Sequence, residues 1–168
     1  MGLDMMLFKA NKQVGIKDRD YLLTLNYEDG EEIAYWRKAN MVHRWIYKNC
    51  ALKGQNDDEF ILVTKYKIKE LLLTAYRVKN SIELVEGDVQ MGSRFENGKF
   101  VPIIERGKVI KDNAICKKLL PTQEGFFFGN LGYNEYYAED IDLTIENLEN
   151  VLSNVNWKEE FVYYYASY

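Results

Sequence analysis

The chain has few of the residues that mark secreted, metal-binding or membrane-spanning proteins. Its 168 residues include two cysteines, two prolines and one histidine. Cys50 and Cys116 belong to no CxxC or Cys/His spacing, so we expect reduced, buried thiols. Uninterrupted apolar stretches are far shorter than the ~20 residues that a membrane-spanning helix needs. A disulfide scaffold, a zinc domain and a membrane span are therefore not predicted.

Motifs for catalysis and phosphate binding are also missing. The sequence contains no GxxxxGK[ST] loop, no GxGxxG after a strand, no HExxH and no GxSxG. His43 is the sole histidine, so neither a metal site nor a Ser-His-Asp triad has a full set of candidates. We therefore expect no cofactor and no bound metal, and we assign no catalytic residue.

What the chain does contain is typical of one soluble domain, residues 1–168. Apolar residues make up 47% and charged residues 29%, and a chain of 168 residues can bury a sizeable core without a disulfide. Aromatic residues are unusually common at 14%, with thirteen tyrosines. No internal repeat, linker or low-complexity segment divides the sequence.

Charge is unevenly distributed along the chain. The net charge is −4, but residues 1–133 carry +3 and residues 134–168 carry −7. Generic DNA binding needs a continuous basic surface, which the acidic end argues against. The first residues, MGLDMML, lack the charged and apolar regions of a signal peptide, so we expect a cytoplasmic protein.

Hydrophobic periodicity and turn signals predict an α+β fold, with about three helices packed on a mainly antiparallel sheet. Apolar residues recur at helical spacing after Thr64 and after Asn134, both suitable N-caps. The Asn97-Gly98 pair is a strong type I′ hairpin signal, and Pro102 favours an edge strand. The predicted elements are strands at 2–10, 60–63 and 161–166, helices at 31–50, 64–80 and 134–153, and a β-hairpin insertion at 86–112.

Glycine and proline positions predict two further features. Glu105–Lys108 is expected to form a second turn inside the insertion. Pro121 and two glycines bracket a constrained loop and a very apolar strand at 126–128. Glycine suits a backbone that takes positive φ or approaches a ligand closely, so Thr122 and Gln123 could face a ligand. A turn into a buried aromatic strand is the alternative interpretation.

The predicted helix at 31–50 carries the main candidate ligand groups. Along one edge of its apolar arc lie aromatic rings, an imidazole, an amide and guanidinium groups. Rings stack on a nucleobase, an amide reads its hydrogen-bonding edge, and arginine pairs with phosphate or carboxylate. A helix whose boundary residues merely pack is the alternative, and His43 on such an arc is more often a core histidine. The candidate ligand-binding residues are Trp36, Arg37, Asn40, His43, Arg44, Tyr47, Thr122 and Gln123.

Several long motifs cover most of the chain apart from residues 10–28 and the insertion. They are Met1–Met5 (MGLDM), Tyr35–Asn40 (YWRKAN) with His43 and Trp45, Leu120–Gln123 (LPTQ), Gly125–Gly129 (GFFFG), Tyr133–Asp140 and the aromatic tail Phe161–Tyr168. On these motifs the chain resembles a family of small, largely uncharacterised proteins encoded by bacteriophages and prophages. Met6 and Tyr168 depart from the family pattern. Some members carry a kinase-like label, which no nucleotide-phosphate motif here supports.

The resemblance implies a gene context more than a mechanism, because a fold or family does not fix function. Phage accessory proteins of this size often disarm host defences, and they act in the cytoplasm of the infected or lysogenic bacterium. We therefore expect a non-catalytic protein that binds a nucleotide-like ligand to counter host defence. In this hypothesis Trp36 and Tyr47 stack on the ligand, and Arg37 and Arg44 neutralise its charge. Directional hydrogen bonds come from Asn40, His43, Thr122 and Gln123.

Two alternatives stay open. An anti-CRISPR-like inhibitor of a host defence nuclease could use the acidic helix as a nucleic-acid mimic, through Asp142, Glu146 and Glu149. A nucleotide-processing enzyme would use His43 as a general acid or base. The expected partner is thus a nucleotide-like small molecule or a host defence protein, with no membrane and no generic DNA binding. Exposed aromatic residues and a β-prone tail also allow a homodimer.

Overall fold

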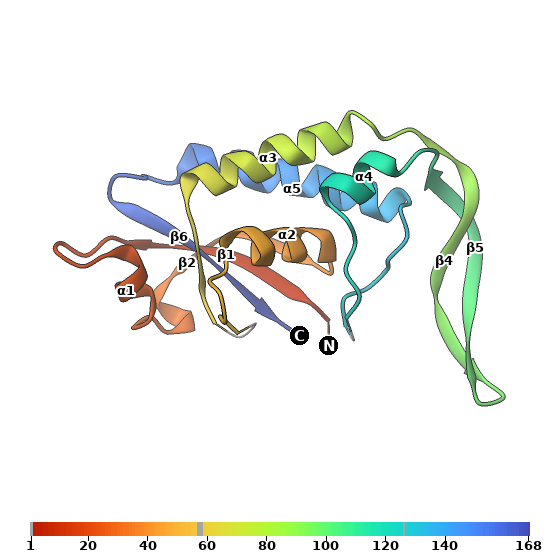
Figure 1. Cartoon of the computed structure of the whole chain (residues 1–168), viewed down its shortest axis with the longest axis horizontal. Helices are drawn as coiled ribbons and strands as arrows, with labels where there is room; N and C mark the ends of the chain where they lie inside the picture. The colour runs from red at the N-terminus through yellow and green to blue at the C-terminus, as the bar shows by residue number, and fades with distance from the viewer. Residues whose placement is uncertain (1, 57–58, 126) are drawn as a thin grey trace.

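A four-stranded antiparallel sheet in the order β2-β1-β6-β3 forms the centre of the protein (Figure 1). The computed structural model describes residues 2–56, 59–125 and 127–168. β1 and β6 pair from Asp4↔Ser167 to Asn11↔Glu160, so the two ends of the chain lie side by side. The strands are β1 (Asp4–Asn11), β2 (Glu31–Arg37), β3 (Ile61–Val63) and β6 (Glu160–Ser167).

The two faces of this sheet are covered unequally because successive side chains of a strand point to opposite sides. Met5 and Leu7 of β1 lie in the larger core, whereas Met6 and Phe8 lie in a smaller cluster on the other face. The long helices cover the larger core, and α1 contributes Leu22 to the smaller cluster. The helices are α1 (Asp18–Leu22), α2 (Asn40–Cys50), α3 (Lys65–Lys79), α4 (Ala114–Leu119) and α5 (Glu135–Asn154), with a 3₁₀ turn, η1 (Tyr27–Asp29).

The predicted insertion is a long β-hairpin, β4 (Leu84–Glu96) and β5 (Lys99–Ile110), which extends away from the body of the protein (Figure 1). Asn97 and Gly98 form its turn with φ of 49° and 79°, as the sequence predicts. The second turn at 105–108 is wrong, because Gly107 pairs with Gly87 and residues 104–110 pair continuously with residues 84–90. A Cβ on Gly107 would lie 2.9 Å from the Val89 side chain, so glycine marks a close approach there.

The α+β class is confirmed, but the predicted helix at 31–50 is wrong in its first half. Glu31–Arg37 is the strand β2, in which Ala34 and Trp36 are buried and Tyr35 and Arg37 are not. Burial with a period of two is the signature of a strand, and pairing with β1 satisfies its backbone. The chain then turns at a residue of positive φ, and α2 begins at Asn40.

Other boundaries agree more closely with the sequence. The strand at the C-terminal end and the helices α3 and α5 are present, and the Thr64 hydroxyl accepts from the Lys67 amide as an N-cap. The predicted strand at 126–128 is not formed by residues 127 and 128, and Phe126 lies outside the described residues. Within the described ranges, no helix is long and apolar enough to cross a membrane.

Cys50 and Cys116 carry free thiols, as their spacing predicts. Cys116 is fully buried and Cys50 partly so, and burial raises the pKa of both thiols, that of Cys50 to about 12. Both groups are therefore protonated at neutral pH.

Helix capping gives a direct test of the fold. The Asn134 side chain accepts hydrogen bonds from the Tyr136 and Tyr137 amides at 3.0 and 3.3 Å. Asn134→Ala should therefore lower the free energy of unfolding by about 1 kcal/mol. Within the described residues, Asn113 makes no side-chain capping bond at the start of α4, so Asn113→Ala is the matched control. Equal denaturation midpoints for the two variants would contradict the assignment of the Asn134 cap.

Candidate functional site

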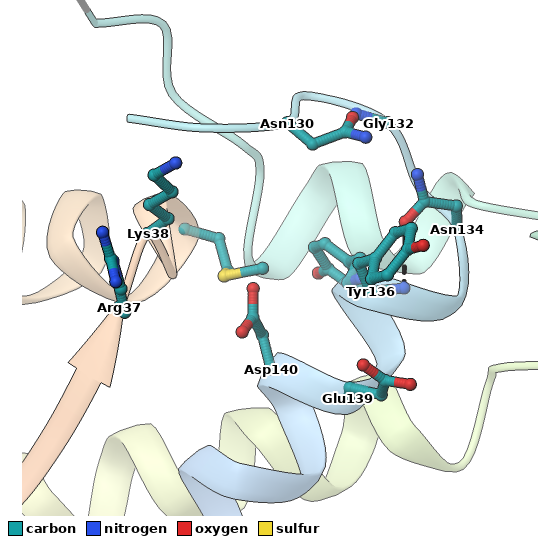
Figure 2. Close-up of a pocket in the computed structure, with 10 residues that line it drawn as sticks. Arg37, Lys38, Asn130, Gly132, Asn134, Tyr136, Glu139 and Asp140 are labelled. Carbon is teal, nitrogen blue, oxygen red and sulfur yellow. Dashed lines mark hydrogen bonds between the residues drawn. The ribbon is translucent and has the colours of Figure 1, made fainter. Parts of the chain in front are cut away.

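A pocket of about 230 Å³ lies where the end of β2 and the start of α2 meet the first turns of α5 (Figure 2). Cationic side chains from the β2–α2 junction form one side, and polar and aromatic side chains from residues 130–137 form the other. The lining residues are Arg37, Lys38, Met41, Asn130, Gly132, Asn134, Tyr136, Tyr137, Glu139 and Asp140.

The cationic side depends on an unusual backbone conformation at Lys38. Its φ is 62°, a left-handed value that few residues other than glycine, asparagine and aspartate adopt readily. The Lys38 amide donates to the Leu3 carbonyl at 2.7 Å, and its carbonyl accepts from the Asn40 amide at 2.8 Å. These bonds hold the sharp turn, so Arg37 and Lys38 lie together at the mouth of the pocket (Figure 2).

Asn40 joins this junction to the loop that follows α4. Its carboxamide NH₂ group donates to the carbonyls of Phe128 and Asn130, both at 3.0 Å, and its oxygen accepts from the Gln123 amide at 3.0 Å. The side chain is 1% exposed, and its bond to the Phe128 carbonyl is fully buried. Asn40 thereby fixes Gln123, Phe128 and Asn130 against the start of α2.

The opposite side is tied to the β4–β5 hairpin. The Asn130 NH₂ group donates to the Gln90 carbonyl at 2.7 Å, and a carboxylate oxygen of Glu135 accepts from the Lys108 amide at 3.3 Å. The Tyr136 hydroxyl lies 3.7 Å from the Met91 sulfur. The base of the hairpin therefore supports the wall of the pocket.

Asp140 is the carboxyl group in the pocket lining whose pKa is shifted. Its carboxylate points into the space between the cationic and the aromatic sides (Figure 2). Burial, with a smaller contribution from the neighbouring Glu139 carboxylate, raises the pKa of Asp140 to about 7. A carboxyl group that changes charge near neutral pH inside a pocket is a common feature of functional sites.

Three of the sequence-predicted ligand residues are enclosed by the protein. Trp36 is 0% exposed, and its indole N–H donates to the Thr144 hydroxyl at 3.0 Å, so its ring offers no face to a ligand. His43 is 2% exposed, and its Nδ1 lies 2.8 Å from the Tyr164 hydroxyl. It is therefore a core histidine, the alternative that the sequence also allows. Tyr47 is partly buried and donates to the Gln55 carbonyl at 2.8 Å.

The other predicted residues divide between the loop and the surface. Gln123 lies against Asn40, and the Thr122 hydroxyl donates to the Leu131 carbonyl at 3.2 Å, so the start of α2 and the 120–129 loop do converge. Arg37 lines the pocket with its side chain 61% exposed. Arg44 lines a different hollow, on the outward side of α2.

Sequence reasoning missed several residues of the pocket. Lys38 lies in the YWRKAN motif, and Tyr136 and Asp140 lie in the Tyr133–Asp140 motif, but the sequence alone predicts no ligand-binding role for them. Asn134 was predicted as a helix cap, which it is, and it also lines the pocket. The available signal was the YNEYYAED segment itself, which begins α5 beside the β2–α2 junction.

Comparisons with family models, with curated proteins and with solved structures find no match to this chain. The resemblance to phage-encoded proteins therefore stays a prediction. Among residues 2–56, 59–125 and 127–168, no group of three or more His, Cys, Asp or Glu side chains is placed to hold a metal ion. The geometry of the pocket thus carries the argument for function.

The Asn40 side chain should matter more for stability than for direct ligand contact. Asn40→Ala leaves the Gln123 amide and two carbonyls without this partner, at a cost of about 1–3 kcal/mol for each buried group left unsatisfied. We expect a clear fall in the denaturation midpoint, measured by circular dichroism. Asn150→Ala on the exposed face of α5 is the control, and an Asn40→Ala protein as stable as that control would contradict this role.

Asp140 should make stability depend on pH. The folded state holds a proton on this carboxyl between its ordinary pKa of 3.8 and about 7, where the unfolded chain has already lost it. Stability should therefore fall as pH rises through this window, and Asp140→Asn should remove that fall. Urea denaturation at about pH 5 and about pH 8 measures the difference. The control is Glu86→Gln on β4, and an unchanged pH dependence in Asp140→Asn would contradict the assignment.

Proposed function

We propose that this protein binds a nucleotide-like anionic ligand in the pocket between β2, α2 and α5, without transforming it. The observation that carries the proposal is the pair Arg37 and Lys38, placed directly before the first turn of α2. Within the described residues, the N-cap Ala39 gives that turn no side-chain hydrogen bond. Two cations beside a helix N-terminus favour a phosphate group.

The opposite side of the pocket suits the remainder of a nucleotide. Tyr136 is 41% exposed, so part of its ring is available for stacking on a base. Asn134 is 3% exposed and its carboxamide oxygen serves the helix cap, so its role is to hold the first turn of α5 in place. Asp140 and Glu139 can accept hydrogen bonds from sugar hydroxyls and direct the phosphate towards the cations.

The size of the pocket limits the ligand. A volume of about 230 Å³ is smaller than the ~300–1,000 Å³ of most ligand sites. A phosphate group and one ring therefore suit it better than a dinucleotide. The resemblance to phage-encoded proteins supports a biological setting in which the bound nucleotide is a signal of host defence.

The alternative of nucleic-acid mimicry is less well supported. Asp142 forms an ion pair with Lys79, and Glu149 accepts a hydrogen bond from the Tyr76 hydroxyl. These contacts with α3 partly neutralise the acidic face of α5. Catalysis through His43 is also less well supported, because its imidazole lies in the core against Tyr164.

Thermal denaturation with a panel of nucleoside monophosphates and cyclic nucleotides tests the proposal. A ligand at about 100 times its dissociation constant should add roughly 2.7 kcal/mol of stability, a shift of several degrees. Arg37→Ala and Lys38→Asn should reduce this shift strongly, since asparagine tolerates the left-handed turn and removes the charge. Arg77→Ala, an exposed cation on α3, is the control. No shift with any compound, or equal shifts in all variants, would contradict the proposal.

A further inference from the structure

A second hollow, of about 220 Å³, lies on the outward side of α2 beside the end of α4. It is separate from the pocket described above, although Met41 contributes to the lining of both. Arg44, Trp45 and Lys48 contribute from α2, and Pro121 closes the other side. The lining residues are Met41, Arg44, Trp45, Lys48, Asn49, Lys118, Leu119 and Pro121.

The charge of this hollow is of one sign. Its lining contains three cations, Arg44, Lys48 and Lys118, and no aspartate or glutamate. Eight other cations each have a carboxylate within 4.0 Å; they are Lys9, Lys12, Arg37, Lys67, Lys79, Arg94, Arg106 and Lys111. In the part of the chain that the structure describes, none of the three cations in the hollow has a carboxylate within 4.0 Å.

This cluster of cations differs in sign from the protein as a whole, whose net charge is −4. Lys48 and Lys118 lie in the last turns of α2 and α4, where a cation stabilises the helix end. That account does not extend to Arg44, which lies one turn earlier in α2. Arg44 and Lys48 are four residues apart, so they occupy the same face of the helix and repel each other unless an anion lies between them.

The hollow combines its cations with a few apolar side chains. Trp45 is 9% exposed, and Leu119 and Pro121 are partly buried. A concave surface of one charge concentrates its electric field in the hollow. Two lysines and an arginine supply enough positive charge and enough N–H donors for a doubly charged oxyanion.

We propose that this hollow is an anion site for the phosphate groups of a small phosphorylated molecule, with Arg44, Lys48 and Lys118 as its ligands. Phosphate fits better than a carboxylate because it carries more charge and more acceptor oxygens than a single carboxylate offers. The acidic segment 134–168 disfavours a long nucleic acid. This site does not depend on the ligand proposed for the pocket at α5.

Isothermal titration calorimetry with inorganic pyrophosphate tests the site directly. The wild-type chain should bind pyrophosphate, and Arg44→Gln and Lys118→Gln should each weaken binding by about tenfold or more. Arg77→Gln, which changes an exposed cation on α3, should keep wild-type affinity. If Arg37→Ala lost pyrophosphate binding while Arg44→Gln kept it, the anion would bind in the pocket at α5 and the proposal would be overturned. Lys99→Gln, an exposed cation at the tip of the hairpin, is the control for net charge.

Each contrary result overturns the proposal. Absence of pyrophosphate binding at low ionic strength would do so, as would equal affinity in Arg44→Gln, Lys118→Gln and Lys99→Gln. Tighter binding of an oligothymidylate than of pyrophosphate would assign the surface to single-stranded nucleic acid instead. If Lys118→Gln lowered the stability of the protein but left pyrophosphate binding unchanged, Lys118 would serve to stabilise the end of α4 and not to bind an anion. Nucleotide-dependent stabilisation that is lost in Arg37→Ala tests the pocket at α5 separately from these results.

Discussion

The three hydrogen bonds of the buried Asn40 carboxamide hold the functional side of this protein together. They join Gln123, Phe128 and Asn130 to the first turn of α2, which brings the loop after α4 beside the start of α5. Met41, the next residue, then lies between two hollows of different character. The first hollow is lined by cations, carboxylates and an aromatic ring, whereas the charged residues that line the second are all cations. The position of both hollows depends on the Asn40 side chain, which is 1% exposed.

The parts of the fold that local chemistry specifies could be predicted from the sequence. The Asn97-Gly98 turn, the Thr64 and Asn134 caps and the β-rich tail each carry their own signal. The strand–helix junction could not be predicted, because its left-handed residue is Lys38 rather than glycine or asparagine. Burial alternates along 31–37, but acidic residues followed by aromatic ones also fit a helix start, and the strand is decided by pairing with β1.

The sequence predicts which segments form the candidate site better than it predicts what each residue does there. The start of α2 and the 120–129 loop converge, yet Asn40 and the backbone of Gln123 bind each other. The sequence alone does not show whether a polar side chain in a motif binds a ligand or a neighbouring backbone group. Asp140 shows the converse, since its raised pKa arises from burial that only the assembled tertiary structure creates.

The central claim is that a nucleotide-like anion binds between the β2–α2 junction and the start of α5. Backbone amide NMR of the ¹⁵N-labelled protein, titrated with a nucleoside monophosphate, tests it most directly. The account predicts progressive shifts for the amides of Arg37, Lys38 and Met41 and for those of residues 130–136, with little change on α3. Shifts confined to other surfaces, or none at all as the nucleotide is raised to saturating levels, would contradict it.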